Sequence, residues 1–383
     1  MTEVNIPLSS PDITEEDVAA VVAVLRTRFL SLGPKLPEFE QAIAAYVDCR
    51  HGVAVNSGTS ALHLIVRALG IGDGDEIITT PFSFVASANC LLYERARPVF
   101  VDIRPDTLNL DCDLVERAIT PRTKAVLAVD VFGRPADWTR LRSLAQQHNL
   151  MLIEDSCEAL GARLRLVDGR WVMAGSLADA GAFAFYPNKQ MTTGEGGVIV
   201  TDRDDVAALC RSMRNQGRDE GAGWLQHARL GYNYRLSDIN CALGLAQLAR
   251  IGEILAARKQ VAAWYANALS GLAEVRVPEA GPNEEISWFV YVVRLTEGLT
   301  RDQRDRVLDG LRARGIGCSN YFSPIHLQPF YREVFGYREG DFPVTESVSS
   351  RTIALPFFTR LSREQVSSVA AALGDAVAGV RRG

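Results

Sequence analysis

The feature that most constrains the fold of this chain is the close alternation of strand and helix patterns over residues 14–200. Short apolar runs such as RPVFVDI, KAVLAVDVF and NLMLIED are typical of buried strands, and the segments DLVERAI and WTRLRSLAQQH between them have helical periodicity. Strands that alternate with helices at this spacing form mainly parallel sheets covered by helices. The sequence therefore predicts an α/β fold with a central, mostly parallel sheet.

The pattern changes after residue 160. The segment ARLRLVDGRWVMAG predicts a hairpin that turns at Asp168–Gly169, and AGAFAFYP and GGVIVT predict two more strands. Residues 237–272 are predicted to be mainly helical, and the remainder of the chain has the mixed pattern of a smaller α+β unit. Because 383 residues are enough for two domains, we expect a large α/β domain of residues 1–255 and a small C-terminal α+β domain of residues 256–383.

Composition and charge exclude several classes of protein. The formal net charge of −5 gives no field that would attract a nucleic acid. The longest apolar stretches are shorter than the roughly 20 residues that span a bilayer, and the N-terminal segment lacks the basic and apolar regions of a secretory signal. We therefore expect a cytoplasmic protein with no nucleic-acid or membrane partner. The seven cysteines are scattered and never spaced as CxxC, so neither a disulfide framework nor a metal site is expected.

A turn rich in small hydroxyl side chains follows the strand pattern HGVAV. The turn Asn56-Ser57-Gly58-Thr59-Ser60 precedes a helical pattern that ends at Gly70. Free backbone amides at a helix N-terminus form an anion site suited to a phosphate group. The same residues are also those of an ordinary N-terminal helix cap, so this turn alone leaves both interpretations open.

Two charged residues beside apolar strands could do chemistry. Asp155 follows Glu154 at the end of the strand pattern LMLIED, where open α/β sheets bind their ligands. Lys189, one of four lysines, lies between the apolar run FAFYP and the turn TTGEGG. Apolar surroundings disfavour the charged ammonium, as a Schiff-base nucleophile requires. Taken singly, each of the two residues could equally be a solvated surface group.

The order of these three features indicates a particular chemistry. A phosphate turn, a carboxylate after a strand and a strand-flanked lysine are the parts that a pyridoxal phosphate enzyme needs, in the order expected. The lysine binds the cofactor aldehyde, the carboxylate keeps the pyridine nitrogen protonated, and the turn anchors the phosphate.

At these residues the sequence resembles the DegT/DnrJ/EryC1/StrS sugar aminotransferases, a branch of the fold-type I pyridoxal phosphate enzymes. The resemblance covers nearly the whole chain and implies the two-domain fold-type I architecture. Its motifs, in order, are NSGTSAL at 56–62, FVDI and TLNLD within 100–111, EDSCEALGA at 154–162, FAFYPNKQMTTGEGG at 183–197, LGYNYRLSDI at 230–239 and YFSPIHLQPFY at 321–331.

The resemblance implies catalytic roles for two residues and cofactor contacts for two more. Lys189 matches the lysine that binds the cofactor covalently, and Asp155 matches the partner of the pyridine nitrogen. Glu158 matches a polar group near the phenolic oxygen of the cofactor. Phe84 matches an aromatic residue that stacks on the cofactor ring.

The resemblance also implies how the phosphate is held. Gly58 and Thr59 match residues whose amides bind it, and Asn233 matches an asparagine that reaches it from the other subunit, which implies a homodimer with shared active sites. One position departs from the family pattern. Many relatives have serine where this chain has Ala184, and the serine hydroxyl binds the phosphate, so this chain must anchor the group by other means.

The reaction that the resemblance implies is a ping-pong transfer of the amino group of L-glutamate to a nucleotide-linked keto-sugar. A dehydratase branch of the family has histidine at the position of Lys189, so the lysine favours transamination. A 4-keto-6-deoxyhexose giving a 4-amino sugar is our preferred acceptor, because YPNKQMTTGEGG is more similar to the 4-aminotransferases. A 3-keto-sugar or keto-cyclitol aminotransferase is the alternative, and a non-catalytic sensor with the same fold is an alternative from a different class.

Three residues are candidates for contacts with the substrates. Glu195 lies in the GEGG turn after Lys189, Arg235 could bind an anionic substrate, and His326 lies in the motif SPIHLQP near the sugar site of the family. Each has an ordinary structural alternative: a turn residue for Glu195, a surface arginine for Arg235, and a histidine bonded to the backbone for His326.

Overall fold

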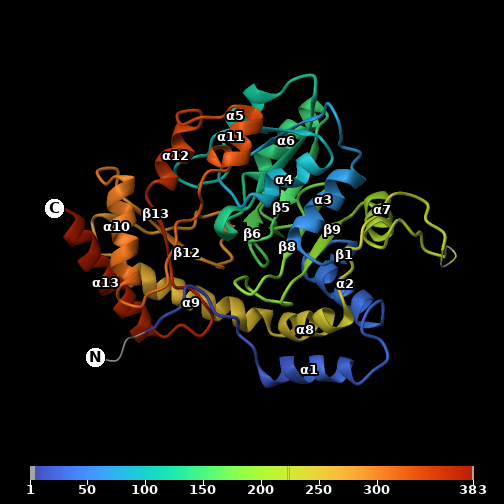
Figure 1. Ribbon diagram of the computed structural model, residues 1–383, viewed down its shortest axis with the longest axis horizontal. Coiled ribbons are helices and arrows are strands. Elements are labelled where there is room, and N and C mark those ends of the chain that lie inside the picture. Colours follow the sequence, from blue (N-terminus) through green and yellow to red (C-terminus); the bar gives the residue numbers. More distant parts are fainter. Residues whose placement is uncertain (1–4, 222, 224, 382–383) are drawn as a thin grey trace.

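The computed structural model describes residues 5–221, 223 and 225–381, and a seven-stranded sheet lies at its centre (Figure 1). The helices are α1 (Glu15–Leu25), α2 (Lys35–Tyr46), α3 (Gly58–Ala68), α4 (Ala86–Tyr93), α5 (Cys112–Ala118), α6 (Trp138–His148), α7 (Asp204–Arg214), α8 (Asp238–Ala249), α9 (Ile251–Leu269), α10 (Arg301–Arg312), α11 (Pro329–Phe335), α12 (Pro343–Ser349) and α13 (Arg363–Arg381), with 3₁₀ turns η1 (Val131–Gly133) and η2 (Ile325–Leu327). The strands are β1 (His51–Val55), β2 (Glu76–Thr79), β3 (Arg97–Phe100), β4 (Thr123–Val129), β5 (Met151–Asp155), β6 (Arg163–Arg165), β7 (Trp171–Met173), β8 (Ala180–Ala184), β9 (Gly197–Thr201), β10 (Val275–Arg276), β11 (Glu284–Glu285), β12 (Tyr291–Leu295) and β13 (Thr352–Leu355).

The central sheet confirms the predicted α/β class. Its strand order is β1-β9-β8-β5-β4-β2-β3. The pairs from β8 through β5, β4 and β2 to β3 are parallel, whereas β9 runs antiparallel to both β8 and β1. The sheet is therefore mostly parallel, with an antiparallel edge made by β9 and β1.

Helices cover both faces of this sheet, as the alternation of side chains along a strand requires. In β4, Ala125 and Leu127 belong to a core shared with α3, α4 and α7, whereas Val126 and Ala128 belong to a core shared with α5 and α6. A third core joins the same sheet to α2 and α8. Both faces of β5 are therefore covered by helices. The carboxyl end of this strand, where open α/β sheets bind ligands, is the place for a site.

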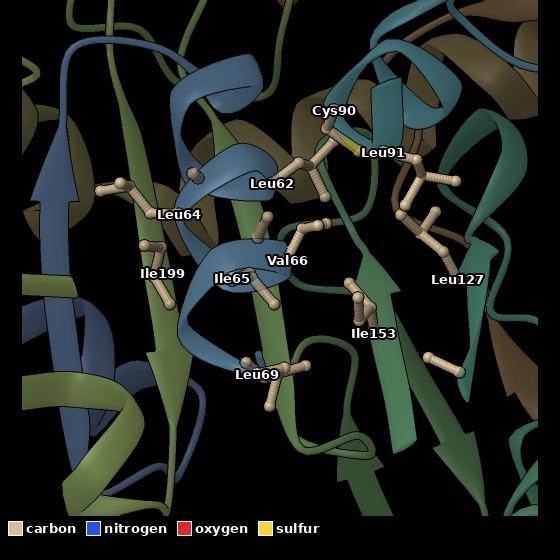
Figure 2. Close-up of a cluster of buried hydrophobic side chains, with 14 of the residues drawn as sticks. Leu62, Leu64, Ile65, Val66, Leu69, Cys90, Leu91, Leu127, Ile153 and Ile199 are labelled. Carbon is tan, nitrogen blue, oxygen red and sulfur yellow. The ribbon is translucent and has the colours of Figure 1, made fainter. Parts of the chain in front are cut away.

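Helix α3 is fixed to the sheet by its apolar residues. Figure 2 shows Leu62, Ile65 and Val66 among the buried side chains that include Cys90 of α4 and Ile153 of β5. All five side chains are at most 1% exposed. The N-terminus of α3 is consequently held in a defined position relative to the end of β5.

A separate apolar core lies in the C-terminal third of the chain, on the left of Figure 1. It contains the sheet β10-β12-β13 and residues of α9, α10 and α13. Ile6 near the N-terminus is fully buried in the same core. The boundary expected at residue 255 falls inside α9, which extends from this core toward α8.

The predicted hairpin at Asp168–Gly169 is confirmed by the antiparallel pairing of β6 with β7, and Gly169 has the positive φ of 86° that such a turn requires. Strand β6 also pairs with β11, so the segment between β10 and β12 is tied to the large sheet domain. Among the described residues, no single helix is long and apolar enough to cross a membrane. Only α8 and α9 together, bent by 65° at their junction, pass that test.

Candidate active site

Asp155 lies at the carboxyl end of β5 and is nearly fully buried. Ser87 Oγ donates to Asp155 Oδ2 at 2.6 Å, and the backbone amide of Cys157 donates to Oδ1 at 3.2 Å. Behind Ser87, Ser83 Oγ lies 2.9 Å from Ser87 Oγ. These bonds fix the carboxylate in one orientation and satisfy part of its hydrogen-bonding capacity, as a buried charged group requires.

Lys189 lies in the turn after β8, and its side chain is only 13% exposed. Its Nζ lies 3.7 Å from Glu158 Oε1 and 4.3 Å from the centre of the Phe289 ring. The neighbouring Gln190 anchors the turn, because its Nε2 donates to the carbonyl of Glu158 at 2.7 Å and to Ser287 Oγ at 2.8 Å. The amine is therefore held between a carboxylate and an aromatic face.

Glu158, three residues after Asp155, is buried. Burial raises the pKa of its carboxyl, and the nearby ammonium of Lys189 opposes this shift. Its Oε2 accepts a hydrogen bond from the backbone amide of Phe132 at 2.9 Å. The Phe132 ring in turn stacks against Tyr321, with ring centres 6.5 Å apart. Glu158 thus connects the lysine to an aromatic wall from the C-terminal part of the chain.

The turn at residues 56–60 forms the N-terminus of α3, which we call the α3 cradle. Ser57 is the N-terminal cap, and its Oγ accepts from the amide of Ser60 at 3.1 Å. A Cβ atom added at Gly58 would lie 2.7 Å from Cβ of Ala184 and 2.9 Å from Sγ of Cys157. Glycine is therefore required here, because only it lets the helix end approach β8 and the end of β5 this closely.

These residues fit pyridoxal phosphate. The first amides of a helix have no acceptor within the helix, so those of Gly58 and Thr59 are suited to a phosphate. Gly58 is packed against Cys157, two residues after Asp155, so the anion site and the carboxylate lie at the same end of the sheet. A buried carboxylate, an amine and a helix N-terminus are the donor set that this cofactor needs.

The remaining predicted cofactor residues, Phe84 and Asn233, are both exposed. Phe84 directly follows Ser83 and precedes α4, and the residue is 61% exposed. Asn233 is exposed and lies in an extended segment that bridges Asn215. The structure therefore groups Asp155, Glu158, Lys189 and Gly58 in one chain, while Asn233 faces outward.

The three substrate candidates differ in their surroundings. Glu195 is exposed in the turn before β9, and Arg235 donates to Asn215 Oδ1 at 3.1 Å. His326 in η2 is fully buried, and its Nε2 lies 3.0 Å from Glu346 Oε1. Its ring packs edge-on against Phe342. His326 is thus enclosed and bonded to a side-chain carboxylate rather than to the backbone partners of the structural alternative, and this enclosure gives no support to a direct substrate contact.

A pair of buried carboxyls lies directly behind Asp155. Asp130 and Glu154 are both fully buried, and Ser156 Oγ lies 2.6 Å from Asp130 Oδ2 and 3.1 Å from Glu154 Oε1. Burial raises the pKa of Asp130 to about 6. Burial, reinforced by the charge of Asp130, also raises the pKa of Glu154 well above its usual range. The pair therefore releases its protons at a higher pH than ordinary carboxyls do.

Sequence reasoning missed the residues that orient the site from elsewhere in the chain. Ser87 could have been found, since Ser83 and Ser87 are one helical turn apart in PFSFVAS. Phe289 could not, because nothing in its own segment points to Lys189. The contact exists only because the C-terminal part of the chain folds back over the turn after β8.

Comparison with known proteins identifies the family. The model of the DegT/DnrJ/EryC1/StrS aminotransferase family matches residues 11–374. GDP-perosamine synthase of Caulobacter vibrioides is 39% identical over 371 residues, which cover 96% of this chain and 97% of that protein.

Solved structures agree. The sugar aminotransferase candidate Spr1654 from Streptococcus pneumoniae, in its PMP form, has a TM-score of 0.93 and 29% identity over 98% of this chain and 100% of its own, and a PLP form is also known. DesI, solved in the presence of its TDP-sugar product, has a TM-score of 0.88 and 32% identity over 100% of this chain and 95% of its own. The chain therefore belongs to the DegT/DnrJ/EryC1/StrS family and is a pyridoxal phosphate-dependent sugar aminotransferase.

Proposed function

We propose that this enzyme transfers the amino group of L-glutamate to a nucleotide-linked 4-keto-6-deoxyhexose and so produces a 4-amino sugar. The observation that carries the proposal is the grouping of Lys189 with Glu158 and Phe289, beside Asp155 and the α3 N-terminus. GDP-perosamine synthase and the TDP-sugar product of DesI support an acceptor linked to a nucleotide. The choice of ring carbon rests on the motif YPNKQMTTGEGG.

In this proposal Asp155 and the α3 cradle hold the cofactor. When bound, pyridoxal phosphate supplies a reactive aldehyde and an electron-accepting ring. The carboxylate of Asp155, oriented by Ser87, would hold a proton on the ring nitrogen. The amides of Gly58 and Thr59 would hold the phosphate, and Phe84 would cover the ring.

Lys189 carries the proton in both halves of the reaction. In the first half Nζ takes the proton from the α-carbon of glutamate, and 2-oxoglutarate leaves. In the second half Nζ returns a proton to the sugar carbon that receives the nitrogen, and the amino sugar leaves. Overall the nitrogen moves from glutamate to the sugar, while water supplies the keto oxygen of 2-oxoglutarate and the keto oxygen of the sugar leaves as water. Glu158, 3.7 Å from Nζ, and the Phe289 ring restrict the positions of the amine. The apolar wall of Phe289 also excludes water from that side.

A 3-keto-sugar or a keto-cyclitol acceptor would use the same cofactor site, so these alternatives differ from our proposal only in the substrate. A non-catalytic sensor is disfavoured because this chain keeps both Lys189 and Asp155 and belongs to an aminotransferase family. We further propose that Glu195 and Arg235 contact a substrate. The protein would act as a homodimer in which Asn233 of each chain reaches the phosphate in the other.

The test is an assay of purified enzyme with L-glutamate and a panel of nucleotide-linked 3-keto and 4-keto sugars and keto-cyclitols. The proposal predicts amination of the 4-keto-6-deoxy sugars, whereas turnover confined to 3-keto sugars or cyclitols would replace it by that alternative. Lys189→Ala should abolish turnover while the fold is retained. Borohydride reduction and peptide mapping should place the cofactor on the peptide that contains residue 189.

A further inference from the structure

The segment that carries Asn233 is an extended strand with two different faces. Its backbone forms isolated bridges to Asn215, through Asn233, and to Val55, through Arg235. Tyr232 and Tyr234 are half-buried, whereas Asn233 between them is exposed. Since successive side chains of an extended segment point to opposite sides, whatever holds the two tyrosines also determines where Asn233 points.

The two tyrosine rings are packed as a unit against one histidine. Tyr232 and Tyr234 stack with ring centres 4.8 Å apart and an interplanar angle of 10°. His63 of α3 contacts both, with ring centres 4.8 Å from Tyr232 and 5.9 Å from Tyr234. His63 Nδ1 also lies 3.2 Å from the Tyr234 hydroxyl. The stack is therefore fixed by ring contacts and by a polar contact.

A single carboxylate ties this arrangement together. Glu94 Oε1 lies 2.8 Å from His63 Nε2 and accepts from the Tyr232 hydroxyl at 3.3 Å. Arg67 Nη1 donates to Glu94 Oε1 at 3.0 Å and to Oε2 at 2.8 Å, and the guanidinium lies 5.7 Å from the Tyr232 ring centre. The side chains of His63 and Glu94 are 5% and 13% exposed. Such a mostly buried polar cluster fixes a geometry, since leaving any of its members unpaired is costly.

Helix α3 gives the cluster a rigid base. His63 and Arg67 are four residues apart and therefore lie on one side of α3, whose apolar residues fix it to the sheet (Figure 2). The same helix begins at Gly58, where its first amides form the α3 cradle proposed to hold the phosphate. One helix thus connects the cradle of its own chain to the segment that carries Asn233.

We infer that His63, Arg67 and Glu94 are positioning residues that hold the Tyr232–Tyr234 stack and thereby direct Asn233 to the cofactor phosphate of a second copy of the chain. The inference rests on the proposed function, because it requires a homodimer with shared sites. None of the three residues needs to touch the cofactor or a substrate. Their effect is transmitted through the tyrosine stack, across the subunit boundary, into the site of the other chain.

The first test is the affinity of homodimers for pyridoxal phosphate. Glu94→Gln leaves Arg67 without its charged partner and loosens the Tyr232 contact, so we expect cofactor binding to weaken roughly tenfold, as misplacement of a binding group does. Glu116→Gln, which removes the charge of a half-exposed ion pair with Arg140, is the matched control and should leave binding unchanged. Tyr234→Phe keeps the ring and loses only the contact with His63 Nδ1, so it provides a second variant that should weaken binding less.

The decisive test uses mixed dimers, purified through two affinity tags, in which Lys189→Ala occupies one chain. The other chain carries Glu94→Gln and retains Lys189. The site of that chain receives Asn233 from the Lys189→Ala chain, in which the cluster is intact. We therefore expect borohydride-fixed cofactor at that site with wild-type affinity. If the affinity stays as weak as in the Glu94→Gln homodimer, the cluster acts on the cradle of its own chain and the inference is wrong.

A second mixed dimer tests separately the proposal on which this inference rests, namely that Asn233 of one chain reaches the phosphate in the other. Mixed dimers of Lys189→Ala with Asn233→Ala should also recover wild-type affinity at one site. If they do not, the shared site itself is wrong, and the inference falls with it. If they recover and the Glu94→Gln pair does not, only the positioning role is overturned.

Discussion

Ser87 Oγ donates a 2.6 Å hydrogen bond to Asp155 Oδ2, so the carboxylate assigned to the ring nitrogen is oriented by a hydroxyl on α4. A hydrogen bond to a charged group contributes about 1.5–3 kcal/mol. We predict that Ser87→Ala lowers the rate of the glutamate half-reaction roughly tenfold with little change in the KM for glutamate, because the carboxylate loses its fixed orientation. Stopped-flow absorbance of the cofactor measures this rate.

Ser143→Ala, which removes a partly exposed hydroxyl of α6, is the control for Ser87→Ala and should keep the wild-type rate. A Ser87→Ala enzyme with an unchanged half-reaction would show that the backbone amide of Cys157 alone is enough to orient Asp155.

The second prediction concerns Ala184, the departure from the family pattern. Its Cβ faces Gly58 in the cradle. Ala184→Ser would add a hydroxyl donor there, and one hydrogen bond contributes about 1 kcal/mol, so we expect cofactor affinity to rise roughly fivefold. Equilibrium dialysis measures the affinity, with Ala263→Ser on the exposed side of α9 as the control. Unchanged or weaker binding would mean that the amides and Asn233 already satisfy the phosphate.

The third prediction follows from the closeness of Gly58 to its neighbours. In Gly58→Ala the new methyl would lie 2.7 Å from Ala184 Cβ, closer than real contacts allow, so the start of α3 must shift. We expect cofactor affinity to fall at least tenfold and the double variant Gly58→Ala/Ala184→Gly to recover part of it. Gly252→Ala is the matched control, because a Cβ there meets nothing within 4 Å.

A Gly58→Ala protein that keeps wild-type affinity would contradict the assignment of the cradle. So would a double variant that is no better than the single one, if both are folded.

The fourth prediction concerns the pH dependence of stability. The pKa of Asp130 is raised to about 6, and that of Glu154 is raised well above its usual range. The folded state therefore keeps protons that the unfolded chain releases above about pH 4. The contribution of the pair to stability is complete below that pH and is lost as the pH rises through 6 and beyond.

Asp130→Asn removes one member of this pair and its repulsion of Glu154. The difference in unfolding free energy, wild type minus variant, should fall by about 1.4 kcal/mol per pH unit over the window in which one proton is released. Urea denaturation at several pH values gives this slope. Asp113→Asn, at an exposed site of α5, is the control. Parallel stability curves for wild type and Asp130→Asn would contradict the assignment.

Local signals explain what the sequence predicts well. Thr14, within a segment typical of a helix start, caps α1 and forms a capping box with Asp17. Gly169 turns the β6–β7 hairpin, as predicted. Residues 237–272 are helical as predicted, but the helix breaks at Arg250, whose guanidinium is bound by Asp12 and Asp17. The apolar stripe continues across the break in the sequence, and the ion pairs of Arg250 at the break come from residues more than 200 positions away.

The same distinction applies to the candidate site. Asp155, Lys189 and Gly58 each follow or precede a recognisable strand or helix, and family motifs mark them. That β1 lies antiparallel to β9 at the sheet edge, and that Phe289 faces Lys189, depends on pairing between distant segments. No local propensity encodes such pairing.

Ser287, which accepts a hydrogen bond from Gln190 beside Lys189, also links the C-terminal third of the chain to the sheet domain. The backbone amide of Ser287 donates to the carbonyl of Gly133 at 2.9 Å, and its hydroxyl donates to the carbonyl of Leu160. Any movement of the C-terminal third of the molecule would therefore strain these bonds, which lie beside the turn that carries Lys189. Opening and closing of the enzyme would then displace groups next to Lys189 and not only groups at the entrance of the site.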